Sequence, residues 1–453
     1  MRAGQNTRDM TSGSPLGLIA RFALPIMAGN ALQQFYSLVD SLVIGRVEGV
    51  TALAAVSASG WLDWLVLSLA MGLAQGFAIR IAQEFGAGDM GSLRRSAGQS
   101  ILLASAATLL LEALAQGLLA PILRLLSTPQ DTFALTLRYL RIIFAGLPLV
   151  MGVNLLGGFL RSVGDSRTPL FAMIASTLCN ALLDVLFVAL FRWGVAGAAL
   201  ATTLSQGASF LFCLRAVAKL PFYRVGRADL KADPRLSRAL LRLGVPIAFA
   251  NLVISVGGLI LQRVVNGFGF VFMAGFNAAS RMQGLIEMAG SSLGSAVGTY
   301  AGQNIGAGRM DRVRQGVRQS LVFALLLALA VGLPMLLFGR QLLSLFVDDD
   351  PALVEQVLTY GSRFLTVMSL SLPALYFLFV YRSALQGMGD TFIPMLSGFM
   401  ELACRVAAVL LLPLVLGEWG VYTAETAAWL GAAVLLAAGY YRRLRRPAAP
   451  RKT

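Results

Sequence analysis

The sequence contains no histidine among its 453 residues and only three cysteines, Cys179, Cys213 and Cys404. The lack of histidine excludes a Ser-His-Asp triad, imidazole metal ligands and a histidine proton switch. The cysteines lie inside apolar runs without the spacing of a disulfide framework or metal site, so we expect them to pack. No Walker-type phosphate-binding sequence occurs either, which argues against ATP-driven pumping. We therefore expect no enzyme, no bound cofactor and no transition metal.

Charged residues are also scarce, at 13%, whereas hydrophobic residues make up 57%. A soluble domain has about 25% charged residues, so this chain has too little polar surface to fold in water. Its apolar runs are long enough for helices that cross the hydrocarbon core, which takes about 20 residues. The strand-length alternation of an outer-membrane barrel is absent. These features predict an all-α integral membrane protein whose surroundings are the lipid bilayer.

Twelve membrane-crossing helices are predicted from the apolar runs. They span residues 17–45, 52–84, 95–121, 134–163, 168–191, 194–219, 239–266, 272–303, 316–339, 353–386, 391–416 and 421–443. The net charge of +15 gathers in alternate connectors and in the tail. Under the positive-inside rule this pattern places both termini in the cytoplasm, and it explains the basic charge without a nucleic-acid partner. Eleven or thirteen helices would scatter the arginines across both faces.

The two halves of the sequence repeat each other. Residues 83–100 and 303–320 share a Gly-Ala-Gly connector, Pro25 recurs as Pro246, and a Gly-Asp-x-x-x-Pro turn also occurs twice, each about 220 residues later. Six helices in each half predict two parallel lobes related by a pseudo-twofold axis along the membrane normal. The predicted parts are a cytoplasmic segment 1–16, an amino-terminal lobe 17–220, a cytoplasmic loop 221–238, a carboxy-terminal lobe 239–443 and a cytoplasmic basic tail 444–453.

Asp40 lies between apolar neighbours in the first predicted helix. A carboxylate at membrane depth costs about 2.5–3.5 kcal/mol, so such a residue usually has a function. The alternative is a position near the outer interface, where Arg46 and Glu48 follow. Gln33 and Tyr36 share the helix face of Asp40 and are candidates for the wall of a substrate cavity.

A second polar group lies in the fifth and sixth predicted helices. Asn180 and Asp184 are four residues apart and share a helix face, and Thr202 follows in the next helix. Their oxygen atoms would suit a sodium ion, and the carboxylate could carry a proton instead. The pattern does not choose between these ions. Asn180 and Thr202 could also serve only to bond helices together.

The second lobe has fewer candidates. Glu401 and Arg405 lie four residues apart, so we predict that they form a structural ion pair. Glu287 has no obvious helical partner and is a candidate for recognising the charge of a substrate.

Three further residues could shape a cavity or its opening. Met27 and Met173 could line an adaptable binding cavity, although methionine more often fills a core. Pro25, followed by Gly29, predicts a hinge, because proline removes a backbone hydrogen bond.

The order and spacing of these motifs resemble the multidrug and toxic compound extrusion (MATE) transporters along essentially the whole chain. The resemblance rests on Pro25 with QQFYSLVDSLVIGR, both Gly-Ala-Gly connectors, the R-x-x-GD-x-x-x-P turn, NALLD and GVAGAALAT. The polar cluster is similar to the DinF-type bacterial branch. The resemblance implies a monomeric antiporter of the bacterial inner (plasma) membrane that exports small organic cations in exchange for sodium ions or protons. It places the cation site at Asp40, Asn180, Asp184 and Thr202, with Asn154 close by.

An alternative substrate class remains open. A flippase or exporter of an anionic lipid-linked or other amphipathic substrate would require arginines that face its cavity. Arg80, Arg263, Arg281 and Arg405 are possible members of such a set.

Overall fold

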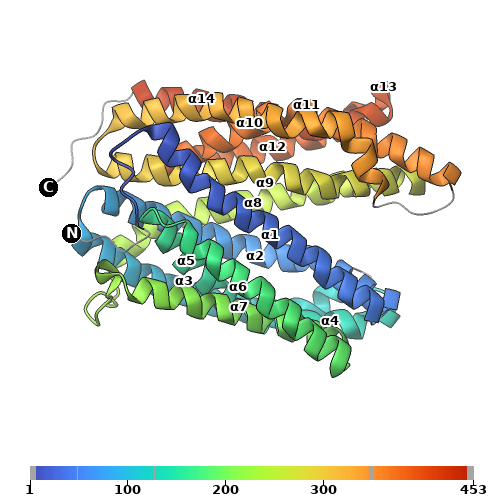
Figure 1. Ribbon diagram of the computed structural model, residues 1–453, viewed down its shortest axis with the longest axis horizontal. Coiled ribbons are helices and arrows are strands. Elements are labelled where there is room, and N and C mark those ends of the chain that lie inside the picture. Colours follow the sequence, from blue (N-terminus) through green and yellow to red (C-terminus); the bar gives the residue numbers. More distant parts are fainter. Residues whose placement is uncertain (1–6, 48, 127, 346–350, 446–453) are drawn as a thin grey trace. The chain divides into compact units, whose positions relative to one another are not determined.

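The computed structural model describes residues 7–445 apart from residues 48, 127 and 346–350, and it describes the side chains except those of residues 35–59 and 61. Within this part the chain is helical and contains no β-strand, which confirms the predicted all-α fold (Figure 1). The helices are α1 Pro15–Val47, α2 Gly49–Gly86, α3 Met90–Leu125, α4 Gln130–Ala145, α5 Leu147–Ser162, α6 Arg167–Asp184, the π-helix η1 Val185–Leu190, α7 Gly194–Ala218, the 3₁₀ turn η2 Pro221–Tyr223, α8 Pro234–Gly267, α9 Phe270–Gly306, α10 Met310–Ser344, α11 Pro351–Gly387, α12 Phe392–Leu411, α13 Pro413–Leu416 and α14 Glu418–Arg445.

All twelve predicted segments are helical in the described residues, but three of them are interrupted. The chain bends by 45° between α4 and α5, beside Gly146. The α-helix of α6 passes into the π-helix η1, and α12 ends before the short helix α13. Pro148 and Pro413 lie at the starts of α5 and α13. Because proline has no N–H to offer the preceding turn, these two residues explain two of the interruptions.

Ten of the described helices are long and apolar enough to cross a membrane, and the bent α4–α5 pair makes an eleventh. Helix α9 is not among them, because glycine, serine, Arg281 and Glu287 lower its hydropathy. It packs against α11 and, to a lesser extent, against α10. The Tyr376 hydroxyl of α11 donates to the Ile286 carbonyl of α9 at 2.8 Å. A helix sheltered by protein in this way need not be as apolar as one that faces lipid.

The described residues fall into two compact units. Unit 1 contains the residues up to Met10 and Leu24–Ala248, and unit 2 contains Thr11–Ala23 and the residues from Phe249 onward. The first turns of α1 therefore belong to unit 2, and the first turns of α8 belong to unit 1. The boundaries predicted for the two lobes stay a prediction.

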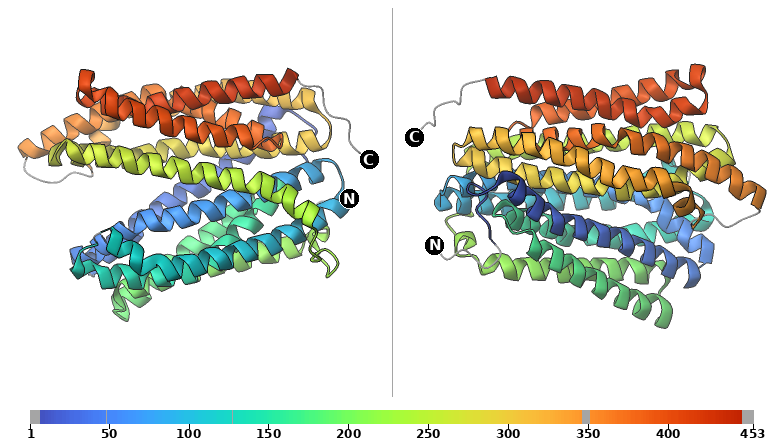
Figure 2. Two further views of the ribbon diagram at one scale, coloured as in Figure 1. Left: turned by 180° about the vertical axis from the view of Figure 1, so that it is seen from behind. Right: turned by 45° about the horizontal axis from the view of Figure 1, so that its top comes forward.

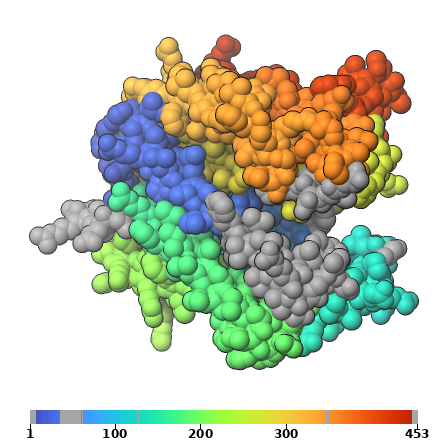
Figure 3. Space-filling model, turned by 45° about the vertical axis from the view of Figure 1, so that its right-hand side comes forward, coloured from blue at the N-terminus to red at the C-terminus, as the bar shows by residue number. Residues whose placement is uncertain are grey.

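Unit 1 is built around a core between α2, α3 and α5, in which Phe77, Leu93 and Leu160 are fully buried. Small residues allow α2 and the start of α8 to touch, because a Cβ on Gly76 would overlap the backbone of Gly244. The outward side chains of α6, drawn green in Figure 3, include the exposed Leu182.

Unit 2 consists of the end of α8, the helices α9 to α14, and the first turns of α1. Helix α11 packs against α9, α10 and α14, and these helices run side by side in both views of Figure 2. Unit 2 contains an aromatic cluster. The ring centroids of Phe276 and Phe364 are 4.3 Å apart, and Phe272 stacks on Tyr422 with 5.5 Å between the ring centroids. These rings form a rigid apolar core for the unit.

Candidate functional site

A row of polar side chains runs along α6 beside α7 in unit 1. We define the polar seam as Ser176, Asn180 and Asp184 of α6 with Thr202 and Ser205 of α7. The three α6 residues are buried and spaced every fourth position, which keeps them on one helix face. The Ser176 hydroxyl donates to the Ser205 carbonyl at 2.9 Å, and the Ser205 hydroxyl donates to the Thr202 carbonyl at 2.8 Å. The first of these bonds ties the two helices together at the seam, and the second lies within α7.

Asn180 and Asp184 are each 1% exposed. Asp184 is the last residue of α6, and the π-helix η1 begins directly after it. A π-turn widens a helix and often occurs at functional sites. Within it, the ring of Phe187 stacks on that of Trp193, with 5.0 Å between the ring centroids. A carboxylate buried in such surroundings needs a proton, a cation or polar partners to offset its lost hydration.

Thr202 and Thr203 of α7 are both partly buried. Thr203 packs at the bend between α4 and α5, because a Cβ on Gly146 would lie 2.7 Å from its Cγ2 atom. The carbonyl of Thr202 belongs to the polar seam through its bond with Ser205. The structure therefore brings Asn180, Asp184 and Thr202 onto two helices that are bonded to each other.

The predicted site residues of α1 are only partly described. Asp40 and Tyr36 fall within α1, but their side chains lie outside the described residues. Gln33 is exposed on the same helix. The position of Asp40 relative to the polar seam stays a prediction.

Helix α1 meets α6 near the predicted hinge. Pro25 lies inside α1, which continues as a helix on both sides of it. A Cβ on Gly29 would lie 3.2 Å from the Sδ atom of Met173 on α6. Met173 thus packs against α1, while Met27 is partly buried. Asn154 of α5 donates to the Val150 carbonyl of its own helix at 2.9 Å.

Four charged residues form two ion pairs inside unit 2. Arg382 of α11 pairs with Glu401 of α12, and Arg405 of α12 pairs with Glu425 of α14, with 2.8 Å between Nη2 and Oε2. Glu401 and Arg405 are each 4% exposed, and Glu425 is 7% exposed. The predicted Glu401–Arg405 pair is therefore wrong. The two residues share a helix face, but each reaches an opposite charge on a neighbouring helix.

Glu287 of α9 accepts a hydrogen bond from the Nε2 atom of Gln283 at 2.7 Å. The expectation that Glu287 lacks a helical partner is therefore wrong, because Gln283 lies one turn earlier on the same helix. A neutral amide carries no charge that would form an ion pair with the carboxylate, so Glu287 stays a candidate for binding a positive charge.

Several residues of these clusters were not singled out from the sequence. Glu425 is an acid inside the apolar run 421–443. Its position within a membrane-crossing segment could have identified it, because such an acid usually has a partner or a function. Ser176 lies four residues before Asn180, so helical spacing could have added it. Arg382 lies near the end of the predicted helix 353–386, and nothing in the sequence indicated its pairing with Glu401. Among the described residues, no group of three or more Cys, Asp or Glu side chains could hold a metal ion.

Comparison with known proteins gives consistent similarities. The MatE family pattern matches residues 25–186 and again residues 246–409, so the match itself repeats. The chain is 32% identical over 428 residues to the "Probable multidrug resistance protein YpnP" of Bacillus subtilis, covering 93% of this chain and 91% of that protein. It is 26% identical over 411 residues to the "FAD transporter" of Shewanella oneidensis, covering 88% of each.

The fold also matches a solved structure. The structure of a MOP superfamily transporter from Pyrococcus furiosus aligns with a TM-score of 0.92 at 22% identity, covering 98% of this chain and 99% of that one. At this identity the likeness concerns the fold.

Proposed function

Because this chain belongs to the MatE family of membrane transporters, we propose that it is a secondary active antiporter. It exports small organic compounds, cationic and amphipathic, in exchange for sodium ions or protons by alternating access. The name of the Bacillus subtilis relative, a probable multidrug resistance protein, supports efflux of varied compounds. We place the protein in the bacterial plasma membrane as a monomer with both termini in the cytoplasm.

The polar seam is the observation that carries this proposal. Asp184 is a carboxylate at 1% exposure in a helix whose outer face carries exposed leucines. Binding one monovalent cation there changes the net charge inside unit 1 by one. Because electrostatic interactions are strong in a low-dielectric interior, this change affects charged and polar groups some distance away. Asn180 and Thr202 supply further oxygen atoms for a sodium ion, and we propose Asp40 of α1 as the second carboxylate.

Exchange follows from competition for this negative charge. A coupling ion neutralises Asp184 in one state and leaves in the other, and the cationic substrate binds when the carboxylate is free. One charge that moves through 100 mV supplies about 2.3 kcal/mol, enough for roughly fifty-fold accumulation of a substrate.

The remaining candidates receive roles around this centre. We propose Pro25 as the hinge of α1, because the chain passes from unit 2 to unit 1 between Ala23 and Leu24, directly before it. Glu287 would hold the positive charge of a substrate in unit 2. Met27, Met173, Gln33, Tyr36 and Asn154 would line the substrate cavity.

Ethidium efflux from proteoliposomes tests the proposal. A sodium gradient and a pH gradient are imposed separately on wild type, Asp184→Asn and Asp131→Asn. Asp131 is an exposed carboxylate in the first turn of α4 and serves as the matched control. We expect one gradient to drive efflux in wild type and in Asp131→Asn, and neither to do so in Asp184→Asn. Absence of cationic-dye efflux from wild type under both gradients would contradict the proposal.

A second candidate substrate class is an anionic amphipathic compound. The Shewanella oneidensis relative is named a transporter of FAD, which carries negative phosphates. The partly buried Arg382 and the buried Arg405 show that unit 2 can hold guanidinium groups, although both are paired with carboxylates. Counterflow of FAD without counterflow of ethidium in the same vesicles would favour this candidate.

A further inference from the structure

Two glutamines at equivalent positions of the internal repeat contact the beginnings of α8 and α1. Gln99 and Gln319 are the next-to-last residues of the repeated stretches 83–100 and 303–320, so they occupy the same register. Each of the two helices starts in one unit and continues in the other. The glutamines thus hold the two helices that connect the units.

Gln99 holds the start of α8 within unit 1. Its Nε2 atom donates to the Lys231 carbonyl at 2.5 Å, and its Oε1 atom accepts from the Asp233 backbone N–H and the Ser237 hydroxyl, both at 3.2 Å. The residue is 2% exposed. Nearby, Arg94 pairs with Asp229 at 3.0 Å. We call this set of contacts the α8 anchor.

Because Gly98 has no side chain, the backbone of Asp229 packs directly against it at the α8 anchor. A Cβ on Gly98 would overlap the carbonyl oxygen of Asp229. The start of α8 is therefore firmly attached to α3. The attachment consists of the buried hydrogen bonds of Gln99, the Arg94–Asp229 ion pair and the close packing on Gly98.

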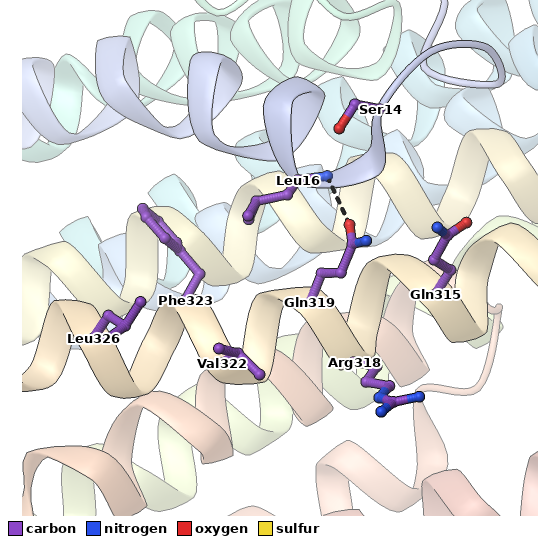
Figure 4. A pocket seen from close by; sticks show the side chains of 8 residues that line it. All are labelled: Ser14, Leu16, Gln315, Arg318, Gln319, Val322, Phe323 and Leu326. Carbon is purple, nitrogen blue, oxygen red and sulfur yellow. Dashed lines mark hydrogen bonds between the residues drawn. The ribbon is translucent and has the colours of Figure 1, made fainter.

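Gln319 holds the start of α1 within unit 2. Its Oε1 atom accepts from the backbone N–H of Leu16 at 3.1 Å, as Figure 4 shows. This N–H belongs to the first turn of α1, where the helix has no internal partner for it. Just before it, Arg309 donates to the Thr11 carbonyl at 2.6 Å and Arg312 donates to the Gly13 carbonyl at 2.9 Å. We call these contacts the α1 latch.

The α1 latch is more open to its surroundings than the α8 anchor. Gln319 is only partly buried, and the bonds of Arg309 and Arg312 are exposed. A cavity of about 540 Å³ adjoins the Gln319–Leu16 bond and is lined in part by Ser14 and Phe323 (Figure 4). Exposed hydrogen bonds next to free volume open at lower cost than buried ones.

We propose that Gln319 is a positioning residue whose bond to Leu16 opens and closes during transport, while Gln99 keeps α8 permanently anchored. The first turns of α1 then detach from unit 2 in one transport state and reattach in the other. Helix α1 continues from these turns through Pro25 to Asp40, both in unit 1, so its attachment in unit 2 acts on the helix that carries those residues. The inference rests on the proposed function, because it assigns a role within that transport cycle.

Amide hydrogen exchange of the purified full-length protein tests the latch without requiring transport. Gln319→Met removes the acceptor oxygen at similar length, and Gln319→Glu keeps an acceptor. We expect residues 16–20 of wild type to exchange faster than residues 236–240 of α8. Gln319→Met should speed exchange of residues 16–20 roughly fivefold, the effect of one lost hydrogen bond. Gln319→Glu should match wild type. The matched variant Gln99→Met should speed exchange at residues 236–240 and leave residues 16–20 unchanged.

A second readout separates a transport role from a structural one. In vesicles, Gln319→Met should change the maximal rate of ethidium efflux at constant KM, and Gln319→Glu should restore it. Exchange at residues 16–20 that is equal in wild type and Gln319→Met overturns the latch, and so does an unchanged maximal rate. If wild type moves no substrate but Gln319→Met still speeds exchange, the latch contact stands and the proposed function fails.

Discussion

Removing one charge of a buried ion pair in unit 2 should cost more stability than removing both. Arg405 pairs with Glu425 at 2.8 Å and also donates to the Ile254 carbonyl at 3.4 Å. Its guanidinium lies over Gly257, where a Cβ would overlap it. Arg405→Met would leave Glu425 buried at 7% exposure without its guanidinium partner.

The magnitude follows from the burial of both partners. Removing one member of a buried pair costs about 3–5 kcal/mol, whereas replacing both by apolar groups of similar size is often neutral or stabilising. We therefore expect Arg405→Met to lower the free energy of unfolding by about 3–5 kcal/mol. The double variant Arg405→Met/Glu425→Met should regain most of that loss.

Thermal unfolding of the purified protein in detergent measures the effect as a double-mutant cycle. A second cycle pairs Arg405→Met with Glu401→Met. The structure predicts the larger coupling between Arg405 and Glu425, because Glu401 is held by Arg382. A larger coupling between Arg405 and Glu401 would refute the pairing described here and restore the pair predicted within α12.

Two further predictions concern the connectors of unit 1. Gly98→Ala would place a Cβ against the Asp229 carbonyl, and we expect it to destabilise the packing of the connector 221–238 on α3 by about 1–3 kcal/mol. The expected result is faster tryptic cleavage of this connector after Arg227 and Lys231. Gly117→Ala on the same helix meets open space and should leave cleavage unchanged. Asp89 caps α3 by accepting from the Ser92 N–H at 2.9 Å, and this bond lowers the pKa of Asp89. Its stabilisation is therefore complete above the unfolded pKa of about 3.9 and is lost as pH falls through the lower folded pKa. Melting curves should show Asp89→Ala less stable than wild type by about 1 kcal/mol at pH 7 and by less below the folded pKa, where the protonated carboxyl caps as a neutral group. Asp89→Asn should show no such dependence on pH.

The helices could be predicted from the sequence because lipid leaves few alternatives to a long helix for an apolar run. All twelve segments were found, and helical spacing alone placed Asn180 and Asp184 on one buried face. The breaks were harder to foresee. Pro148 marks the bend beside Gly146 in the sequence but gives neither its angle nor its contact with Thr203, and the π-turn after Asp184 has no marker in the local sequence.

Contacts between helices explain most of what the sequence did not show. The four-residue spacing of Glu401 and Arg405 suggested an ion pair, because residues four apart are neighbours on a helix. This rule takes no account of charges on other helices. Arg382 and Glu425 come from two other helices, and only the packing of α12 against α11 and α14 brings them close. The bonds of Gln99 and Gln319 likewise join residues far apart in the chain.

The coupling of ion movement to Asp184 is the central claim, and substrate-evoked ion flux tests it most directly. Ethidium is added to proteoliposomes without an imposed ion gradient, and the movement of protons and of sodium ions is recorded. Wild type and Asp131→Asn should move one of the two ions in the direction opposite to ethidium, and Asp184→Asn should move neither. Full ion counterflow in Asp184→Asn would contradict the account.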